Sequence, residues 1–474
     1  MAPRFRFALA CMLMMLAGSL APRQAAAAPA APVDVRYFKE TGHNLIGDIR
    51  AFYEANGDVA AFGLPLTEVI AENGLQVQYF ERARFELHPE NGDTNFVTLT
   101  LVGRMLTQGR TDAAFQPVVG KTTDKNIFFK ETGHNLGGGF LTTWQKRNGL
   151  VVFGYPLSEE FTEVSPIDGQ TYTVQYFERA RFEYHPEATP GNLVQFGLLG
   201  RQLLDKSSVP AAARKAVPEL KLLSKSTTGY FGSIAERVNN IGRGVQRMSG
   251  QVVQPGGVFS FNTGLGPTGT EDGFVDGYAI VGGKLEKVIG GGLCQVSTTL
   301  YCAAFHAGLG IVERRPHSFS INFYENIVGF DATVYAPTTD FRFRNDMAGQ
   351  VYIIGTTNVD KATATFSLYG FPDGRTTEMV GPKVKNEVKQ GIANWQFDSS
   401  LAKGEIRHFV HGRPGFEVEM QRIIRDASGK VVRTDNLPSK YKPWEDFFLY
   451  GTGVTPPKGV NLVAGDANAD AKKK

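Results

Sequence analysis

The sequence has little cysteine and no excess of charge of either sign. Its 474 residues include 3 Cys, and 50 Lys plus Arg stand against 47 Asp plus Glu, which gives a net charge of +3. So balanced a charge supplies no field that would hold a phosphate backbone, and we therefore expect no nucleic acid as a partner. The length excludes a single small module and predicts about three domains.

Long hydrophobic runs are also missing beyond the first residues. Two arginines precede an apolar run over residues 7–21, and small residues follow to Ala28, which is the pattern of a secretory signal peptide over residues 1–28. The run is shorter than the about 20 residues that a membrane span needs, and no later segment comes close. We therefore predict a secreted, extracytoplasmic protein of the cell envelope, with no transmembrane segment after signal cleavage.

Signal cleavage would leave Cys294 and Cys302. If both lie on one helix, eight residues at ~1.5 Å rise separate them by ~12 Å. A disulfide needs Cα atoms within ~7 Å, so the two cysteines are not expected to pair even where oxidation is permitted. Either they are buried or one thiol has a chemical role.

The first half of the chain contains a duplication. FKETGHN begins at Phe38 and again at Phe129, an offset of 91, whereas QYFERARFE begins at Gln78 and again at Gln175, an offset of 97. The second copy has therefore gained six residues, which we place in a turn around residues 165–169. Each copy joins an amphipathic helical stretch to two short alternating strands, which predicts two small α+β modules, at residues 33–109 and 122–205.

The repeated YFERARFE string allows two interpretations. In a regular strand, Arg82, Arg84 and Glu86 would share one face with Phe80 and could meet a ligand. Alternatively, the charged residues pair with each other and hold the module together. The Phe-Gly-x-Pro element of each copy is similar to LGFP-type repeats associated with the cell wall, and duplication suits weak multivalent attachment.

Four histidines recur with the modules, but each copy supplies two of them, 45 or 51 residues apart and without a nearby cysteine. This spacing favours structural hydrogen bonding over zinc, and we predict neither a metal site nor a cofactor. The four residues are His43, His88, His134 and His185.

The second half contains a block of specific motifs. They are Phe259-Ser260-Phe261-Asn262, Gly266-Pro267, Gly290 to Tyr301 with its CQVSTTLY string, Glu313 to Ser318, Asp331 to Val334 and Asp340 to Asn345. With these motifs the chain resembles the VanW family, whose members occur with peptidoglycan-binding domains. The resemblance runs from about Thr227 to Gly370, and Cys302 and Arg315 stand where the family commonly has Asn and His. We expect an α+β multidomain protein, with a linker at 206–225, a VanW domain at 226–372, a β-rich region at 373–465 and a disordered tail at 466–474.

Within this block, the sequence predicts a reactive cysteine. Three glycines at 290–292 precede a helical apolar period over Gln295–Ala307, which Gly308 ends. Cys294 then lies at a helix N-terminus, where free N–H groups and the helix dipole favour a thiolate and could form an oxyanion hole.

The chain that follows can return to the cysteine. We predict strands at 318–323 and 330–335 joined by a turn near Tyr324, which is seven residues from both His317 and Asp331. These two would then be cross-strand neighbours. Cys294, His317 and Asp331 would form a triad in the order found in papain-like and transglutaminase-like hydrolases.

Three functions remain open from the sequence. The preferred one is Cys-dependent acyl transfer or amide hydrolysis on peptidoglycan or another envelope glycan polymer. The alternatives are a glycan-cleaving enzyme that uses acids such as Glu271, Asp272, Glu313 and Asp331, and a non-catalytic cell-wall binding module linked to glycopeptide resistance. Polar residues of the same motifs are the candidate substrate-binding residues, namely Asn262, Gln295, Ser297, Thr298 and Arg342.

Overall fold

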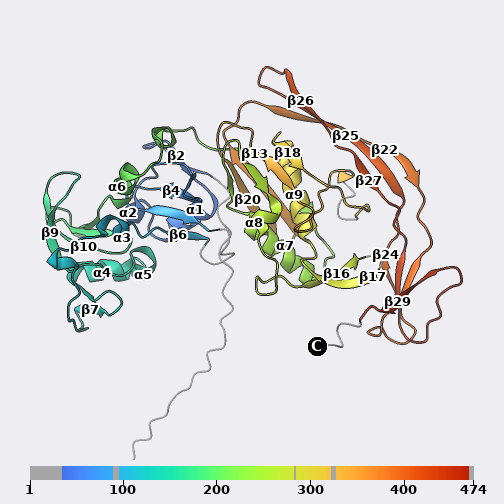
Figure 1. The fold of residues 1–474 in the computed structure, drawn as a ribbon, viewed down its shortest axis with the longest axis horizontal. Coiled ribbons are helices and arrows are strands. Elements are labelled where there is room, and N and C mark those ends of the chain that lie inside the picture. The colour runs from blue at the N-terminus through green and yellow to red at the C-terminus, as the bar shows by residue number, and fades with distance from the viewer. Residues whose placement is uncertain (1–34, 89–95, 282–283, 322–326, 469–474) are drawn as a thin grey trace, which may run out of the picture.

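The computed structural model describes residues 35–88, 96–281, 284–321 and 327–468. Two small modules form one end of the molecule, an α+β domain lies at the centre, and long C-terminal strands arch past that domain (Figure 1). The fold is α+β and multidomain, as the sequence predicts. The predicted signal peptide lies outside the described residues. Within them, no helix is long and apolar enough to cross a membrane.

Each repeat folds as a short hairpin, two helices and a four-stranded antiparallel sheet, followed by a further helix. The six extra residues of the second copy lengthen the hairpin between its first two sheet strands, as predicted. Module 1 contains β1 Arg36–Phe38, β2 His43–Leu45, α1 Gly47–Ala55, α2 Asp58–Phe62, β3 Ile70–Glu72, β4 Leu75–Tyr79, β5 Arg84–Leu87, β6 Val97–Leu99 and α3 Val102–Thr107. Module 2 contains η2 Ala113–Phe115, β7 Asn126–Phe129, β8 His134–Gly137, α4 Gly138–Lys146, α5 Gly149–Val152, β9 Phe161–Val164, β10 Thr171–Tyr176, β11 Arg181–Tyr184, β12 Val194–Phe196 and α6 Leu199–Lys206.

The repeated YFERARFE string is not one regular strand. Phe80 donates its N–H to the carbonyl of Ala83 at 2.8 Å, so the chain turns between β4 and β5. The turn brings Phe80 and Phe85 onto the same core, with ring centroids 4.3 Å apart. The predicted alternation of faces is therefore wrong, because the string contains a turn.

The charged residues of the string hold the modules together. Arg84 pairs with Glu72 and Glu86, and Arg181 pairs with Glu163 and Glu183. These ion pairs agree with the interpretation in which the charged residues stabilise each module. They do not agree with the one in which the residues form an open charged face for a ligand. The four repeated histidines likewise lie within hydrogen-bonding distance of glutamates: His43 of Glu68, His88 of Glu86, His134 of Glu159 and His185 of Glu183.

The last helix of each module contacts the other module. The N–H of Arg104 on α3 donates to the carbonyl of Glu178 in module 2 at 3.1 Å, and that of Arg201 on α6 donates to the carbonyl of Glu81 in module 1 at 3.0 Å. Both contacts are close, because a Cβ at Gly103 or Gly200 would overlap the facing backbone. The duplicated modules therefore pack against each other as one unit.

The central domain packs two helices on an antiparallel sheet of order β13-β21-β20-β14. Strand β13 begins at Lys221, so the end of the predicted linker already belongs to this sheet. A second sheet, β15-β19-β18, and the hairpin β16-β17 complete the domain. Its elements are β13 Lys221–Gly229, α7 Ala235–Met248, β14 Val252–Val253, β15 Val258–Ser260, α8 Phe261–Leu265, β16 Asp276–Val281, β17 Lys284–Ile289, α9 Leu293–His306, β18 Gly310–Glu313, β19 Arg342–Arg344, β20 Val351–Asn358 and β21 Thr363–Gly370.

Module 1 is attached to the central sheet. Tyr352 on β20 donates its hydroxyl to the buried carboxylate of Glu68 at 3.0 Å, and Gln76 donates to the carbonyl of Val252 at 2.9 Å. Tyr352 and Ile354 share a hydrophobic core with Ile49 of α1. The contact orients the repeat pair relative to the central domain.

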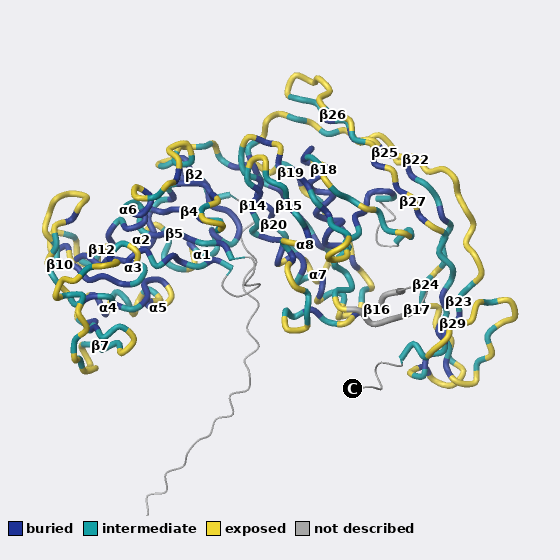
Figure 2. The backbone as a smooth tube through the Cα atoms, viewed as in Figure 1, coloured by how far each residue is buried: buried dark blue, intermediate teal, exposed yellow. Residues whose placement is uncertain are grey.

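The C-terminal region consists of strands, as predicted. A long ladder of β22 and β25 leads from the central domain to a small sheet of order β24-β28-β23-β29, and much of β22 is exposed (Figure 2). The predicted tail at 466–474 overlaps the ordered chain, because Asp466 belongs to β29 and Ala467 still donates its N–H to the carbonyl of Phe397 at 2.8 Å. The elements are β22 Thr376–Val388, β23 Asn394–Phe397, β24 Ile406–Val410, β25 Gly415–Arg425, β26 Val431–Asn436, β27 Ser439–Tyr441, β28 Phe447–Tyr450 and β29 Asn461–Asp466.

Arg422 on β25 joins the C-terminal region to the end of α9, and its replacement by alanine is expected to lower the free energy of unfolding by about 3 kcal/mol. The side chain is fully buried and donates to the carbonyls of Phe305 at 2.9 Å and Leu309 at 2.8 Å. Urea denaturation would measure the loss. Arg425→Ala, which removes an exposed pair with Glu378, is the control and should change stability by less than about 0.5 kcal/mol. Equal effects of the two variants would contradict the prediction.

Candidate functional site

Helix α9 begins at a glycine turn. Gly292 is its N-cap at φ 113°, and a Cβ there would lie 2.9 Å from Ile241, so both the backbone angle and the space require glycine. The helix runs from Leu293 to His306, close to the predicted range, and places Cys294 in its first turn. In this turn the N–H groups of Leu293 and Gln295 donate to the carbonyls of Gly290 at 3.1 Å and Gly292 at 2.9 Å.

Cys294 is partly exposed and lies among polar groups. Its sulfur is 3.3 Å from the hydroxyl of Thr333 and 3.5 Å from the carbonyl of Val334, and it is hydrogen-bonded to the ring of His317. The described cysteines form no disulfide, as predicted.

His317 and Asp331 meet as expected, although not through a hairpin. The ring Nδ1 of His317 bonds to Oδ2 of Asp331, and the backbone N–H of His317 donates to the same oxygen at 2.8 Å. The strands predicted on either side are absent from the described parts of 318–323 and 330–335, and the turn near Tyr324 lies outside the described residues. Because Nδ1 is held by Asp331, Nε2 is the nitrogen left for the thiol.

Two further residues surround Asp331. Arg314 lies 3.3 Å from Oδ1, and Tyr441 donates its hydroxyl to the same atom at 2.5 Å. Tyr441 belongs to β27 in the C-terminal region, so that region contributes directly to the site. The sequence contains no local signal for this contact, because 110 residues separate the two partners.

The network favours a charged pair at Cys294 and His317. Burial opposes ionisation of the thiol, but the hydrogen bond and charge of His317 outweigh it and lower the pKa of Cys294. Burial also disfavours the imidazolium, yet the bonds to Asp331 and Cys294 raise the pKa of His317 to about 9. The pKa of Asp331 is lowered because His317, Arg314 and Tyr441 outweigh its desolvation. The arrangement therefore favours a thiolate beside an imidazolium over two neutral groups.

Cys302 provides the contrast within the same helix. It is buried, and desolvation raises its thiol pKa. At pH 7 we therefore expect iodoacetamide to alkylate Cys294 at least about tenfold faster than Cys302. Mass spectrometry of the digested chain would measure both rates, and denaturation should make them alike. Equally slow labelling of both thiols in the native fold would contradict the thiolate.

The structure moves three predicted substrate-binding residues into the interior. The side chains of Gln295, Ser297 and Thr298 are fully buried. Gln295 bonds to Thr228 and to the carbonyl of Gly229, and Ser297 and Thr298 donate to the carbonyl of Ala332. Their polar atoms are thus engaged within the protein, and the substrate-binding prediction is corrected for them. They hold α9 against the strand that leads to Thr333.

Asn262 and Arg342 are half-buried on neighbouring elements. Asn262 donates through its side chain to the carbonyl of Thr339 at 3.0 Å and through its backbone to Asp340 at 2.9 Å. It therefore orients the segment that follows Tyr335. A substrate contact by either residue stays a prediction.

Two carboxylates of the glycan-cleaving alternative, Asp272 and Asp331, do not have the environment of a general acid. The hydrogen bond from Arg247 lowers the pKa of Asp272, and Asp331 is held ionised by the network described above. A glycosidase acid needs a raised pKa instead. Glu313 accepts a hydrogen bond from the backbone of Asp340 at 3.3 Å.

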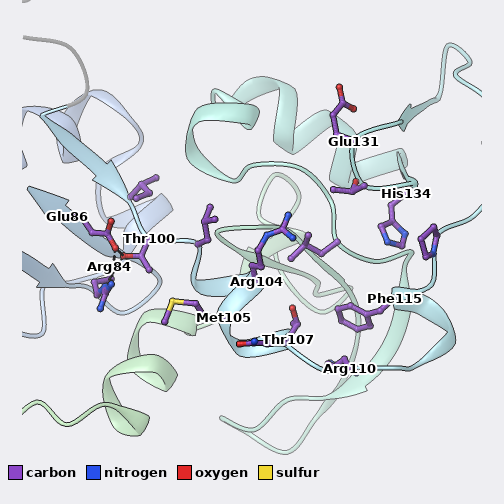
Figure 3. Close-up of a pocket in the computed structure, with 16 residues that line it drawn as sticks. Arg84, Glu86, Thr100, Arg104, Met105, Thr107, Arg110, Phe115, Glu131 and His134 are labelled. Carbon is purple, nitrogen blue, oxygen red and sulfur yellow. Dashed lines mark hydrogen bonds and ion pairs between the residues drawn. The ribbon is translucent and has the colours of Figure 1, made fainter. Parts of the chain in front are cut away.

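A hollow lies between the repeat modules. Its volume is about 910 Å³, and both modules supply its walls (Figure 3). Charged and apolar side chains alternate around it, among them Arg84, Arg104, Met105, Phe115 and Glu131. A lining of this kind suits an extended polar ligand with apolar faces.

The fold and the site define a multidomain α+β protein with a Cys–His–Asp cluster at a helix N-terminus. Residues 236–369 match the family model described as "VanW like protein", so the central domain is similar to that family. The LGFP-like character of the repeats stays a prediction.

Two curated relatives match part of the chain. The chain is 38% identical over 123 residues to "Uncharacterized protein YoaR" of Bacillus subtilis (strain 168). This alignment covers 26% of this chain and 40% of that protein. The chain is 31% identical over 113 residues to "Vancomycin B-type resistance protein VanW" of Enterococcus faecalis (strain ATCC 700802 / V583), covering 23% and 41%. The chain thus matches well under two thirds of the length of these relatives.

Among solved structures, the "IgA1 Protease G5 domain structure" aligns with a TM-score of 0.11 and 20% identity, over 17% of this chain and 98% of that one. The "Crystal structure of HP0197-G5" aligns with a TM-score of 0.09 and 22% identity, over 16% of this chain and 97% of that one. Likenesses of this size carry no argument about function.

Proposed function

We propose that this chain is an exported cell-envelope protein whose VanW-like domain performs Cys-dependent acyl transfer or amide hydrolysis on peptidoglycan or an associated wall polymer. The single observation that carries the proposal is the hydrogen-bonded line from Cys294 through His317 to Asp331. A thiolate at a helix N-terminus with an oriented imidazole is the equipment of an acyl-transfer nucleophile.

The chemistry follows from the positions of these groups. The sulfur of Cys294 attacks the carbonyl carbon of an amide, and the backbone N–H of Cys294, in the first turn of α9, stabilises the oxyanion. His317 then protonates the departing amine, which leaves a thioester on the sulfur. Water or a second amine attacks the thioester with His317 as base, and this step restores the thiol and releases the acid or the new amide. Asp331 keeps the imidazole oriented throughout.

Exposed aromatic side chains near the site support binding of a polymer. Tyr335 is 75% exposed and directly follows Val334, whose carbonyl contacts Cys294. Phe231 is 88% exposed and lies two residues from Gly229, which bonds to Gln295. Such side chains offer flat apolar surface to sugar or peptide. Sequence reasoning missed both residues, because an isolated aromatic in a loop has no periodic pattern.

The repeat pair suits attachment to the wall. The hollow between the modules supplies charged and apolar groups in one place, and the contact of module 1 with the central sheet links it to the domain that carries Cys294. The same observation favours the second candidate function, a protein that only binds the wall. Turnover of substrate separates the two.

The test is product analysis after incubation of the full chain with purified peptidoglycan. Amide chemistry releases new amines and carboxylates or forms new cross-links, whereas glycan cleavage releases new reducing ends. We expect the first set of products, their loss in Cys294→Ala, and their retention in Glu313→Gln. Reducing ends that depend on Glu313 would replace this proposal with the glycan-cleaving alternative. No product from varied wall polymers, together with retained binding, would leave the binding function.

A further inference from the structure

A cluster of metal-ligating side chains lies in the small C-terminal sheet, far along the chain from Cys294. One ligand atom from each of His408, His411 and Asp446 lies within 4.8 Å of the others. His408 is on β24, His411 follows that strand, and Asp446 directly precedes β28, which pairs with β24. Strand pairing therefore brings the three donors together from two segments.

The donors are already oriented. The ring of His408 stacks on Phe448 at a centroid distance of 4.2 Å and an interplanar angle of 15°, and its Nε2 lies 2.8 Å from Oδ1 of Asp446. The carboxylate is held in turn by the N–H of Gly412 at 2.8 Å and by Gln390 at 3.1 Å. Bonds of this kind from neighbouring groups fix the direction of metal ligands in proteins.

We propose that His408, His411 and Asp446 bind a divalent transition metal of the zinc class. Two imidazoles and one carboxylate suit zinc, whereas calcium and magnesium prefer sets of oxygen ligands. Zinc–ligand bonds of about 2.0–2.2 Å place neighbouring ligand atoms about 3.3 Å apart, so small side-chain rotations close the cluster around one ion. Water completes the four-coordinate shell.

The metal has a structural use here. The buried cluster beneath this sheet consists of Leu401, Phe447 and Leu449, with partly buried residues around it. So small a core gains stability from a cross-link between its strands. A metal that bridges the end of β24 to the start of β28 supplies that cross-link, independently of the reaction at Cys294.

The test is zinc binding by the untagged chain, measured by titration calorimetry and by cobalt(II) absorption. We expect one site, at least about tenfold weaker binding in His408→Gln and in His411→Gln, and a zinc-dependent rise in melting temperature in the parent that both variants lose. His88→Gln in module 1 is the matched control, and Cys294→Ser removes the thiol as an alternative ligand. Both controls should bind as the parent does.

Three results would overturn the proposal. They are no zinc binding by the parent, unchanged affinity in both histidine variants, and loss of the site in Cys294→Ser with a thiolate band in the cobalt spectrum of the parent. Because His411 is exposed, its variant tests binding even if His408→Gln disturbs the stack on Phe448.

Discussion

Replacement of Cys294 by serine is expected to reduce the release of wall-derived amide products by about a thousandfold or more. A serine hydroxyl is not ionised by the partners that lower the pKa of Cys294, because its own pKa is far higher. The oxyanion-binding N–H group and the substrate contacts stay in place, so binding of the polymer should be retained. Initial rates on purified peptidoglycan, with a binding assay in parallel, would measure both.

Cys302→Ala is the matched control for this change. Cys302 lies on the same helix but is buried, with its thiol directed to the carbonyl of Phe330 at 3.6 Å. We expect activity within about twofold of the parent and a small loss of stability from the smaller side chain. Full activity in Cys294→Ser, or equal losses in the two variants, would exclude the cysteine mechanism.

Asp331→Asn is expected to lower the rate at pH 7 by about 10³- to 10⁴-fold. The amide removes the charge that keeps the pKa of His317 near 9, and an amide donor can also hold the imidazole in the wrong tautomer. Because less of His317 is then protonated, the thiolate of Cys294 is less stabilised. The pH dependence of alkylation would report this directly, since it depends on no substrate.

The pH dependence of the rate follows from the pKa shifts of Cys294 and His317. In the parent, the reactive pair forms as pH rises through the lowered pKa of Cys294 and is lost as pH rises through about 9, where His317 loses its proton. The rate should therefore be bell-shaped, with its maximum below about pH 9 and its falling side set by His317. In Asp331→Asn the rise should move to higher pH and the maximum should narrow. An unshifted alkylation profile would show that Asp331 does not act through His317.

Asp331→Asn also disturbs Arg314, whose side chain is 4% exposed. Tyr441→Phe separates this structural effect from the electrostatic one, because it removes one hydrogen bond to Asp331 and leaves the charge. We expect the Tyr441 variant to keep the bell shape of the parent, with a smaller loss of rate.

Local patterns in the sequence determined several features correctly. The glycines before Cys294 and the apolar period after it define α9, because helix ends depend on backbone angles within a few residues. The duplication and its inserted turn are visible for the same reason. The sequence-based prediction was wrong where a local pattern fits two structures. The YFERARFE string was predicted as one strand, but it contains a turn that puts Phe80 and Phe85 on one core.

The sequence by itself thus determined that this chain carries a duplicated module and a cysteine at the start of a helix. Only the tertiary structure decided that α3 and α6 each contact the other module, that Gln295, Ser297 and Thr298 face inward, and that Tyr441 reaches Asp331. The physical reason is the distance along the chain over which each interaction acts. Backbone geometry and capping act over one or two turns, whereas burial and partner choice depend on segments that meet after chain separations of about a hundred residues.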